Sequence, residues 1–358
     1  MLSTTKIPLR AQRDPLVLAM GDQVLTVGGF EIDGDSVLAF DDAAVYNTAD
    51  DTWNAVDRAP FSGAPHHVAG VWTGSSAILV GRPCAKTSAE IEEAACPKAA
   101  LEAVRYSPAT RSWRRLPNVI EEGDDGSAPF VATGVGAAGG NAVFKVGSGS
   151  HSGDVLLIKP DGSSSWSAGL KGADATCAIG GKVVAIQTGK VDATGNFIAP
   201  NPVANVEALT VSTLDTERQE WTQTSSVPKP DPTADEVQQV LCGGGAIAYL
   251  GLRGHTATSV LWLDAGTLAW SQLSPIDFGR YPAALAIGAT ASTRVVWDSD
   301  AGHIMSSGQT SNGWTVTTTS PIGGAKLSQL DGILLVDPSY SVRPPDRQYL
   351  AFLKPAKL

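Results

Sequence analysis

Short apolar runs separated by turn residues make up most of the chain, and residues 16–53 show this pattern most completely. Leu16–Met20 and Val24–Val27 are two apolar runs joined by a Gly-Asp dipeptide, which is typical of tight turns. A third run, Ala43–Asn47, and a fourth that begins at Trp53 follow after polar turn residues. Apolar runs of roughly five residues bounded by Gly, Asp and Asn predict strands rather than helices. We therefore expect four antiparallel strands in this stretch.

The same unit recurs along the chain, and most copies end near a Trp. The closing Trp residues are Trp53, Trp113, Trp166, Trp221, Trp270 and Trp314. An apolar hairpin precedes each of them, as in HHVAGVWTGSSAILVG and EVQQVLCGGGAIAYLG. A four-stranded sheet cannot bury both of its faces alone, so such repeats pack against one another. The six Trp residues indicate a β-propeller of six blades, whereas a further hairpin, KLSQLDGILLVD, indicates seven.

We predict an all-β fold, a single seven-bladed β-propeller domain over residues 1–358, with six blades as the alternative. The last hairpin is followed by the strand QYLAFLKP and then by no Trp strand. The N-terminal stretch STTKIPL is expected to supply the missing strand, because pairing the two termini removes two open sheet edges. Division of 358 residues by seven gives about 51 per blade, near the kelch period of about 50.

The Gly-Gly, Tyr and Trp pattern resembles the kelch-repeat β-propeller family over essentially the whole chain. The first repeat has Gly28, Gly29, Tyr46 and Trp53, and the second keeps Gly81, Tyr106 and Trp113. The bias toward Ala, Gly, Asp and Thr is similar to that of exported kelch proteins from high-GC bacteria, with a distant resemblance to the galactose oxidase propeller domain. The resemblance implies the fold and no single activity, because kelch propellers include protein-binding scaffolds, oxidases and sugar epimerases.

Charge and hydropathy exclude two classes of partner. The net charge is -10 and the chain has no basic run, so we expect no nucleic-acid partner. No stretch of 18 apolar residues exists, so we expect no membrane span. The start, MLSTTKIPLRAQRDP, lacks the apolar region of a signal peptide, which leaves a cytoplasmic protein or a mature exported chain.

The four cysteines fall into two pairs. Cys84 and Cys96 lie in one loop, and we predict a disulfide between them, which favours an extracellular or cell-envelope location. Cys177 and Cys242 occupy equivalent positions just before Gly-rich turns in neighbouring repeats. Two buried free thiols are the favoured interpretation there, and a bridge between blades is the alternative.

The candidate ligand site follows from the blade topology. The loop that enters the innermost strand and the loop after the second strand are expected to open on one face, where similar kelch propellers hold their ligands. Aligned on the hairpins, this face receives six candidate ligand-binding residues: Arg13, His66, His67, Asp235, Arg280 and Tyr281. Two guanidinium groups can bind a carboxylate or phosphate in bidentate fashion. The alternative is that each Arg pairs with an acidic neighbour, for which Asp14 and Asp235 are the candidates.

Metal chemistry finds little support in the sequence. His151, His255 and His303 each follow a second strand, and we expect them to lie far apart on the rim of the predicted propeller. No Cys is placed to form the thioether-linked Tyr of the galactose oxidases, so no metal or other cofactor is predicted. Glu31, Asp33 and Asp35 are interpreted as a solvated turn, because the final Glu of a calcium loop is missing.

We expect a monomeric, non-catalytic binding module whose loop face binds a protein or an anionic or carbohydrate ligand. The alternative is an enzyme at the same face that acts on a carbohydrate or a small acid. No catalytic residue is assigned.

Overall fold

The computed structural model consists of antiparallel β-sheets, as the repeat pattern predicts. It describes residues 2–9, 15–33, 36–84, 101–117, 119, 132–147, 152–191, 197–198, 208–228, 237–282, 284–299, 301–311, 313–318, 326–330, 333–337 and 349–353. The chain forms two compact units. Unit 1 comprises Met1–Thr4, Leu170–Val342 and Ala351–Leu358, and unit 2 comprises Thr5–Gly169 and Arg343–Leu350.

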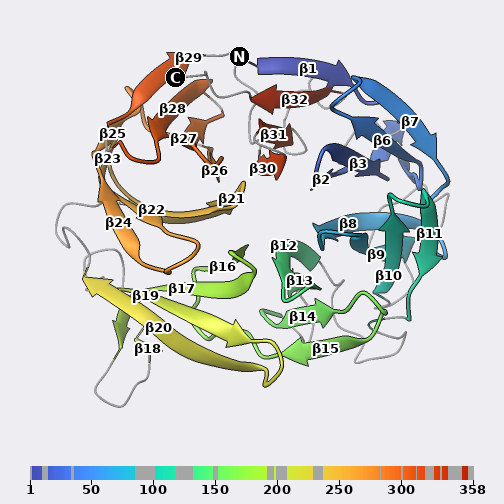
Figure 1. Ribbon diagram of the computed structural model, residues 1–358, viewed down its shortest axis with the longest axis horizontal. Helices are drawn as coiled ribbons and strands as arrows, with labels where there is room; N and C mark the ends of the chain where they lie inside the picture. Colours follow the sequence, from blue (N-terminus) through green and yellow to red (C-terminus); the bar gives the residue numbers. More distant parts are fainter. Residues whose placement is uncertain are drawn as a thin grey trace. The chain divides into compact units, whose positions relative to one another are not determined.

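Unit 2 contains three four-stranded sheets, each built from strands in chain order (Figure 1). The first is β2 (Leu16–Met20), β3 (Gln23–Val27), β6 (Ala43–Asn47) and β7 (Thr52–Val56). The second is β8 (Ala64–Trp72), β9 (Ala77–Cys84), β10 (Glu102–Ser107) and β11 (Ser112–Arg115). The third is β12 (Ala132–Ala138), β13 (Asn141–Val146), β14 (Val155–Ile158) and β15 (Ser164–Ser167). A separate hairpin, β4 (Phe30–Asp33) and β5 (Ser36–Ala39), lies between β3 and β6 in the chain.

Unit 1 contains three further sheets with the same order. The first is β16 (Ala175–Ile179), β17 (Lys182–Val191), β19 (Ala208–Asp215) and β20 (Glu220–Pro228), with β18 (Phe197–Ile198) paired to β17. The second is β21 (Val237–Gly243), β22 (Ala246–Arg253), β23 (Thr256–Leu263) and β24 (Trp270–Leu273), with β25 (Ile276–Asp277) paired to β23. The third is β26 (Leu285–Ala289), β27 (Thr293–Asp298), β28 (His303–Gly308) and β29 (Thr315–Thr318).

One more sheet combines strands from the two ends of the chain. Its order is β1 (Leu2–Lys6), β32 (Tyr349–Leu353), β31 (Ile333–Asp337) and β30 (Lys326–Leu330). The N-terminal strand therefore pairs beside the strand at Tyr349, as the sequence predicts. Because β32 would otherwise present an open edge, this pairing protects its backbone groups.

The hairpin between the third and fourth strands has a recurrent geometry. The residue two positions before the closing Trp has a left-handed backbone in four sheets: Asp51, Arg111, Gln219 and Leu268, with φ between 50° and 61°. In the first two sheets a Tyr lies opposite the Trp, and the ring centroids are 5.2 Å apart for Tyr46–Trp53 and 4.8 Å for Tyr106–Trp113. Such aromatic cross-strand pairs stabilise the outer hairpin.

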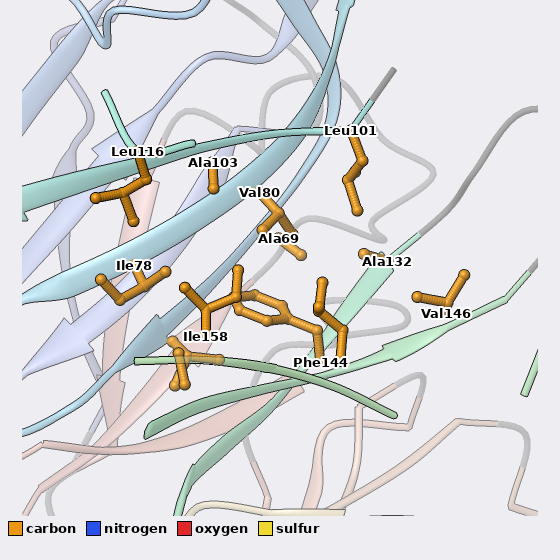
Figure 2. Close-up of a cluster of buried hydrophobic side chains, with 13 residues drawn as sticks. Ala69, Ile78, Val80, Leu101, Ala103, Leu116, Ala132, Phe144, Val146 and Ile158 are labelled. Atoms are coloured by element: carbon orange, nitrogen blue, oxygen red, sulfur yellow. The ribbon is translucent and has the colours of Figure 1, made fainter. Parts of the chain in front are cut away.

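Apolar side chains fill the space between neighbouring sheets within each unit. In unit 2 the first strands β2, β8 and β12 contact one another in sequence. Between the β8–β11 and β12–β15 sheets, Ile78, Val80, Phe144 and Ile158 are fully buried. Figure 2 shows the ring of Phe144 among the aliphatic side chains of this cluster. The alternation of these residues along their strands predicts this packing, since every second side chain faces the neighbouring sheet.

Closing Trp residues also connect neighbouring sheets through hydrogen bonds. The indole of Trp113 donates to the carbonyl of Asp57, which follows the preceding sheet, at 2.7 Å. The indole of Trp314 donates in the same way to the carbonyl of Ser274 at 2.9 Å. The indole ring can therefore bury apolar surface while its N–H group still has a hydrogen-bond acceptor.

The cysteine pairs have different outcomes. Cys177 on β16 and Cys242 on β21 form a disulfide with Cα atoms 6.0 Å apart, so the favoured interpretation of two free thiols is wrong. The error has a geometric cause, because equivalent positions on the first strands of neighbouring sheets lie within disulfide range. Cys177 is buried, as predicted, but Cys242 is exposed. The predicted Cys84–Cys96 bridge lies outside the described residues.

Candidate functional site

Two of the predicted site residues, Arg13 and Asp235, lie outside the described residues. His66 and His67 lie within β8 rather than in the loop before it, and the Cα atom of His66 pairs in register with Arg82 of β9. A register irregularity follows between His66 and Ala69. Arg280 and Tyr281 are therefore the predicted site residues whose surroundings the structure describes.

Arg280 and Tyr281 are displayed on the segment that follows β25. The side chain of Arg280 is 52% exposed, and Tyr281 is 53% exposed. The Nε atom of Arg280 lies 3.9 Å from Oδ2 of Asp298, a residue that is completely buried at the end of β27. Arg280 thus pairs with an acid that the sequence interpretation did not consider, and about half of its side chain stays in solvent. The predicted partners Asp14 and Asp235 lie outside the described residues.

The segment 276–281 is held by its neighbours at several points. Ile276 and Phe278 are each 1% exposed and belong to one apolar cluster in unit 1. The backbone N–H of Phe278 donates to the carbonyl of His255 at 2.9 Å. The N–H of Gly279 donates to Oδ1 of Asp277 at 2.8 Å. The segment therefore presents its exposed side chains from a fixed backbone.

Two histidines from two different sheets contact the segment 276–281. His255, in the turn between β22 and β23, places Nε2 3.7 Å from Oδ1 of Asp277. His303, at the start of β28, forms a hydrogen bond between Nδ1 and the carbonyl of Phe278 at 3.2 Å. The expectation that His255 and His303 lie far apart is wrong, because they bind consecutive residues. A turn after a second strand and the segment that leads to the next first strand are therefore in contact here.

The described residues do not bring these histidines together as a metal site. In that part of the chain, no three His, Cys, Asp or Glu side chains form a group that could hold a metal ion. His151 lies outside it. The contacts of His255 and His303 are with a carboxylate and a backbone carbonyl, so both rings position the segment.

A recurring pair of acid and arginine was missed by sequence reasoning. Asp41 and Glu102 are buried, as Asp298 is. Arg58 lies 3.5 Å from Asp41, and Arg115 donates to Glu102, whose other oxygen accepts the N–H of Ser62 at 2.8 Å. Arg58 follows β7 and Arg115 ends β11, so the first two pairs lie beside fourth strands, whereas Asp298 ends a second strand. The signal in the sequence is weak, since the partners are 13 to 18 residues apart in the three pairs.

Comparison with known proteins shows the fold class and no family. No family model and no curated protein matches the chain. The structure aligns with that of YCF48 bound to a D1 peptide at a TM-score of 0.53 and 11% identity, over 100% of this chain and 96% of that one. A protein from Lactobacillus plantarum aligns at a TM-score of 0.47 and 10% identity, over 88% of this chain and 89% of that one.

The protein is therefore an all-β protein with a β-propeller fold that resembles the fold of YCF48. The resemblance to the kelch family is not accompanied by a match to a family model. No helix in the described part of the chain is long and apolar enough to cross a membrane.

Proposed function

We propose that this protein is a non-catalytic binding module that recognises a protein segment through its loop face. The observation that carries this proposal is the display of Arg280 and Tyr281. Both side chains are about half exposed, yet the backbone beneath them is fixed by Phe278, His255 and His303. Arg and Tyr are enriched among the residues that dominate protein interfaces.

A fixed segment favours binding because less conformational entropy is lost when the partner arrives. Tyr281 offers a rigid apolar ring with a polar end, and Arg280 offers hydrogen-bond donors in a planar fork. The buried Asp298 pairs with the guanidinium of Arg280. The exposed half of the Arg280 side chain can bind an acidic side chain or a terminal carboxylate. The partner segment should therefore combine an acidic group with an apolar contact.

The comparison with YCF48 is in keeping with this class of function, because that structure contains a bound peptide. The wider site of the proposal includes Arg13, His66, His67 and Asp235, which would extend the same loop face. A carbohydrate or small anionic ligand is the alternative occupant of that face. The disulfide is consistent with an extracytoplasmic location.

We also propose that the sheets complete a seven-bladed ring closed by the N-terminal strand, as one monomeric domain. The sheet order β1-β32-β31-β30 supports this proposal, because it joins strands from the two ends of the chain. The seven sheets of four or five strands in the described residues support the same number of blades.

Selection from a random peptide phage library on the purified protein tests the binding proposal. The selected peptides should carry Asp, Glu or a free C-terminal carboxylate. Their affinity should fall by a factor of about ten or more in Arg280→Ala and Tyr281→Ala, as expected when a charge-assisted hydrogen bond or a buried aromatic contact is lost.

Arg218→Ala is the matched control, because Arg218 is an exposed arginine paired with Asp215 at 3.8 Å in the β19–β20 turn. The control should bind the selected peptides as the wild type does. Melting temperatures separate a binding role from a structural one. A lower melting temperature of Arg280→Ala with unchanged peptide affinity would show that Arg280 serves only its pair with Asp298.

A further inference from the structure

The first two sheets of unit 2 have equivalent outer hairpins, β6–β7 and β10–β11, which differ in charge at one position of the turn. In both, a Tyr of the third strand lies opposite the closing Trp, and the residue two before that Trp has a left-handed backbone. That residue is Asp51 in the first sheet and Arg111 in the second. The repeat therefore places a carboxylate in one hairpin where it places a guanidinium in the other.

In the first sheet, the Tyr hydroxyl has an acceptor. Tyr46 is 6% exposed, and its hydroxyl donates a hydrogen bond to Oδ1 of Asp51. Burial, and after it this hydrogen bond, raises the pKa of Tyr46 to about 12. The Tyr46 hydroxyl is thus neutral, and the Asp51 carboxylate accepts its hydrogen bond.

In the second sheet the acceptor is missing among the described residues. Tyr106 is 1% exposed, and a guanidinium at position 111 carries donors only. Burial raises the pKa of Tyr106, and the nearby positive charge of Arg111 acts against that rise. The hydroxyl therefore stays protonated at neutral pH, and a cation lies near it.

A pocket opens beside these two residues. Tyr106 and Arg111 line it together with the amide side chains of Gln23, Asn47 and Asn54 and two valines. The enclosed space is small, about 20 Å³, and the pocket opens to solvent. None of the described side chains that line it is a carboxylate. Nδ2 of Asn47 already donates to Asp50 at 3.3 Å, so Arg111 and the amides of Gln23 and Asn54 are the groups that can meet an occupant. A partly enclosed space with one cation and neutral amide donors favours a negatively charged occupant.

We propose that this pocket binds a small oxyanion of the carboxylate or phosphate type, which takes the position that the Asp51 carboxylate holds in the first sheet. One oxygen accepts the Tyr106 hydroxyl, and the charge pairs with Arg111. The site is separate from the loop segment at 276–281 and does not depend on the peptide-binding proposal.

Titration with sodium acetate, and separately with sodium phosphate, tests the site at constant ionic strength. The readouts are the melting temperature and the carbon chemical shift of the Tyr106 ring in tyrosine-labelled protein, assigned with Tyr106→Phe. We expect a saturable rise in melting temperature and a saturable shift of Tyr106. Arg111→Gln should weaken binding by a factor of about ten or more, the loss of a charge-assisted hydrogen bond.

The variants are chosen so that the fold tolerates them. Gln already occupies the equivalent left-handed position at Gln219, so Arg111→Gln adds no new backbone strain. Arg111→Asp supplies an internal carboxylate, as Asp51 does, and should abolish anion binding while the melting temperature without anion stays level or rises. Arg114→Gln removes a neighbouring exposed charge and should leave binding unchanged.

A blocked aspartate peptide, used in parallel, separates a free anion from an acidic side chain of a partner. Stronger binding of acetate than of the peptide assigns a free anion, and the reverse assigns a partner side chain. The proposal is overturned if neither anion produces a saturable response. It is also overturned if Arg111→Gln responds as the wild type does, because the pocket then holds water only.

Discussion

At the scale of single residues, aspartates at the outer hairpins have a defined role. Asp161, Asp215 and Asp264 each lie at the connection between the third and fourth strands of their sheets. Each carboxylate accepts backbone N–H groups of the residues that follow, for example those of Glu217 and Arg218 at 2.9 and 3.0 Å for Asp215. Such Asx turns pre-order the hairpin before the Trp strand begins.

These hydrogen bonds make the stability of the hairpins depend on pH. The backbone N–H groups are the main cause of a lowered carboxyl pKa at Asp161, Asp215 and Asp264. A lowered pKa in the folded state means that the stabilisation is complete above the unfolded pKa of about 3.9 and is lost as the pH falls through the lower folded value. We expect the melting temperature to fall below about pH 4 for this reason.

The triple variant Asp161→Asn, Asp215→Asn and Asp264→Asn keeps the acceptor oxygens and removes their titration. Its melting temperature should be lower than that of the wild type at pH 7, and the difference should shrink as the pH is lowered to about 3. Glu217→Gln is the charge control, because Glu217 contributes its backbone N–H to the turn. A pH-independent difference between the triple variant and the wild type would contradict the role of these carboxylates.

Single residues of the candidate site were predictable only where their position follows from the strand pattern. Arg280 and Tyr281 were placed on the loop face because they precede a recognisable hairpin. The partner of Arg280 was not predictable. Asp298 ends the second strand, and an Asp at that position in the sequence is typical of a solvent-exposed turn. Its complete burial depends on packing between sheets, which no local pattern encodes.

At the scale of elements, the hairpins and their Tyr–Trp pairs could be predicted because alternation and turn chemistry are local. The predicted strands Leu16–Met20 and Ala43–Asn47 have these bounds in the structure. Contacts between neighbouring sheets were harder to predict. His255 contacts Asp277 of β25, and His303 contacts Phe278, the next residue. The pairing of β25 with β23 brings Asp277 beside the turn of His255, and the short pairing of Ile276 and Asp277 has no distinctive sequence pattern.

The disulfide is a connection between two elements and gives a prediction at this scale. Cys177 and Cys242 join β16 to β21, the first strands of two neighbouring sheets, and their sequence separation is 65. A bridge that closes a loop of this length stabilises a protein by about 2–4 kcal/mol. The double variant Cys177→Ala, Cys242→Ala should lose about this much free energy of unfolding and melt at a lower temperature.

Dithiothreitol provides the matching control for the disulfide. It should lower the melting temperature of the wild type toward that of the double variant. The melting temperature of the double variant should stay unchanged under the same treatment. Mass spectrometry of the non-reduced protein after alkylation must find Cys177 and Cys242 unmodified. Alkylation at both positions without reductant would contradict the bridge.

At the scale of the whole molecule, the repeat pattern carries more information than any single motif. Within each unit the sheets bury apolar faces against neighbouring copies, so the period of apolar hairpins predicts a propeller even where the Gly, Tyr and Trp residues of a repeat are missing. The function does not follow in the same way. A repeated fold places many loops on one face, and the few side chains that differ between copies decide what binds there.

The N-terminal strand β1 completes the sheet that the C-terminal strands form. β1 is the outermost strand beside β32, and the hydroxyl of Thr5 accepts a hydrogen bond from the indole of Trp53 at 3.3 Å. Deletion of residues 1–6 would expose the edge of β32 and remove the acceptor of Trp53, so the melting temperature should fall by several degrees and aggregation should increase. Thr5→Val removes the hydrogen bond and keeps the strand, so it should lower the melting temperature less than the deletion does. If the truncated and full-length chains melt alike, β1 contributes nothing to the last sheet and the proposed closure of the ring fails, because an unpaired edge at β32 would then carry no cost.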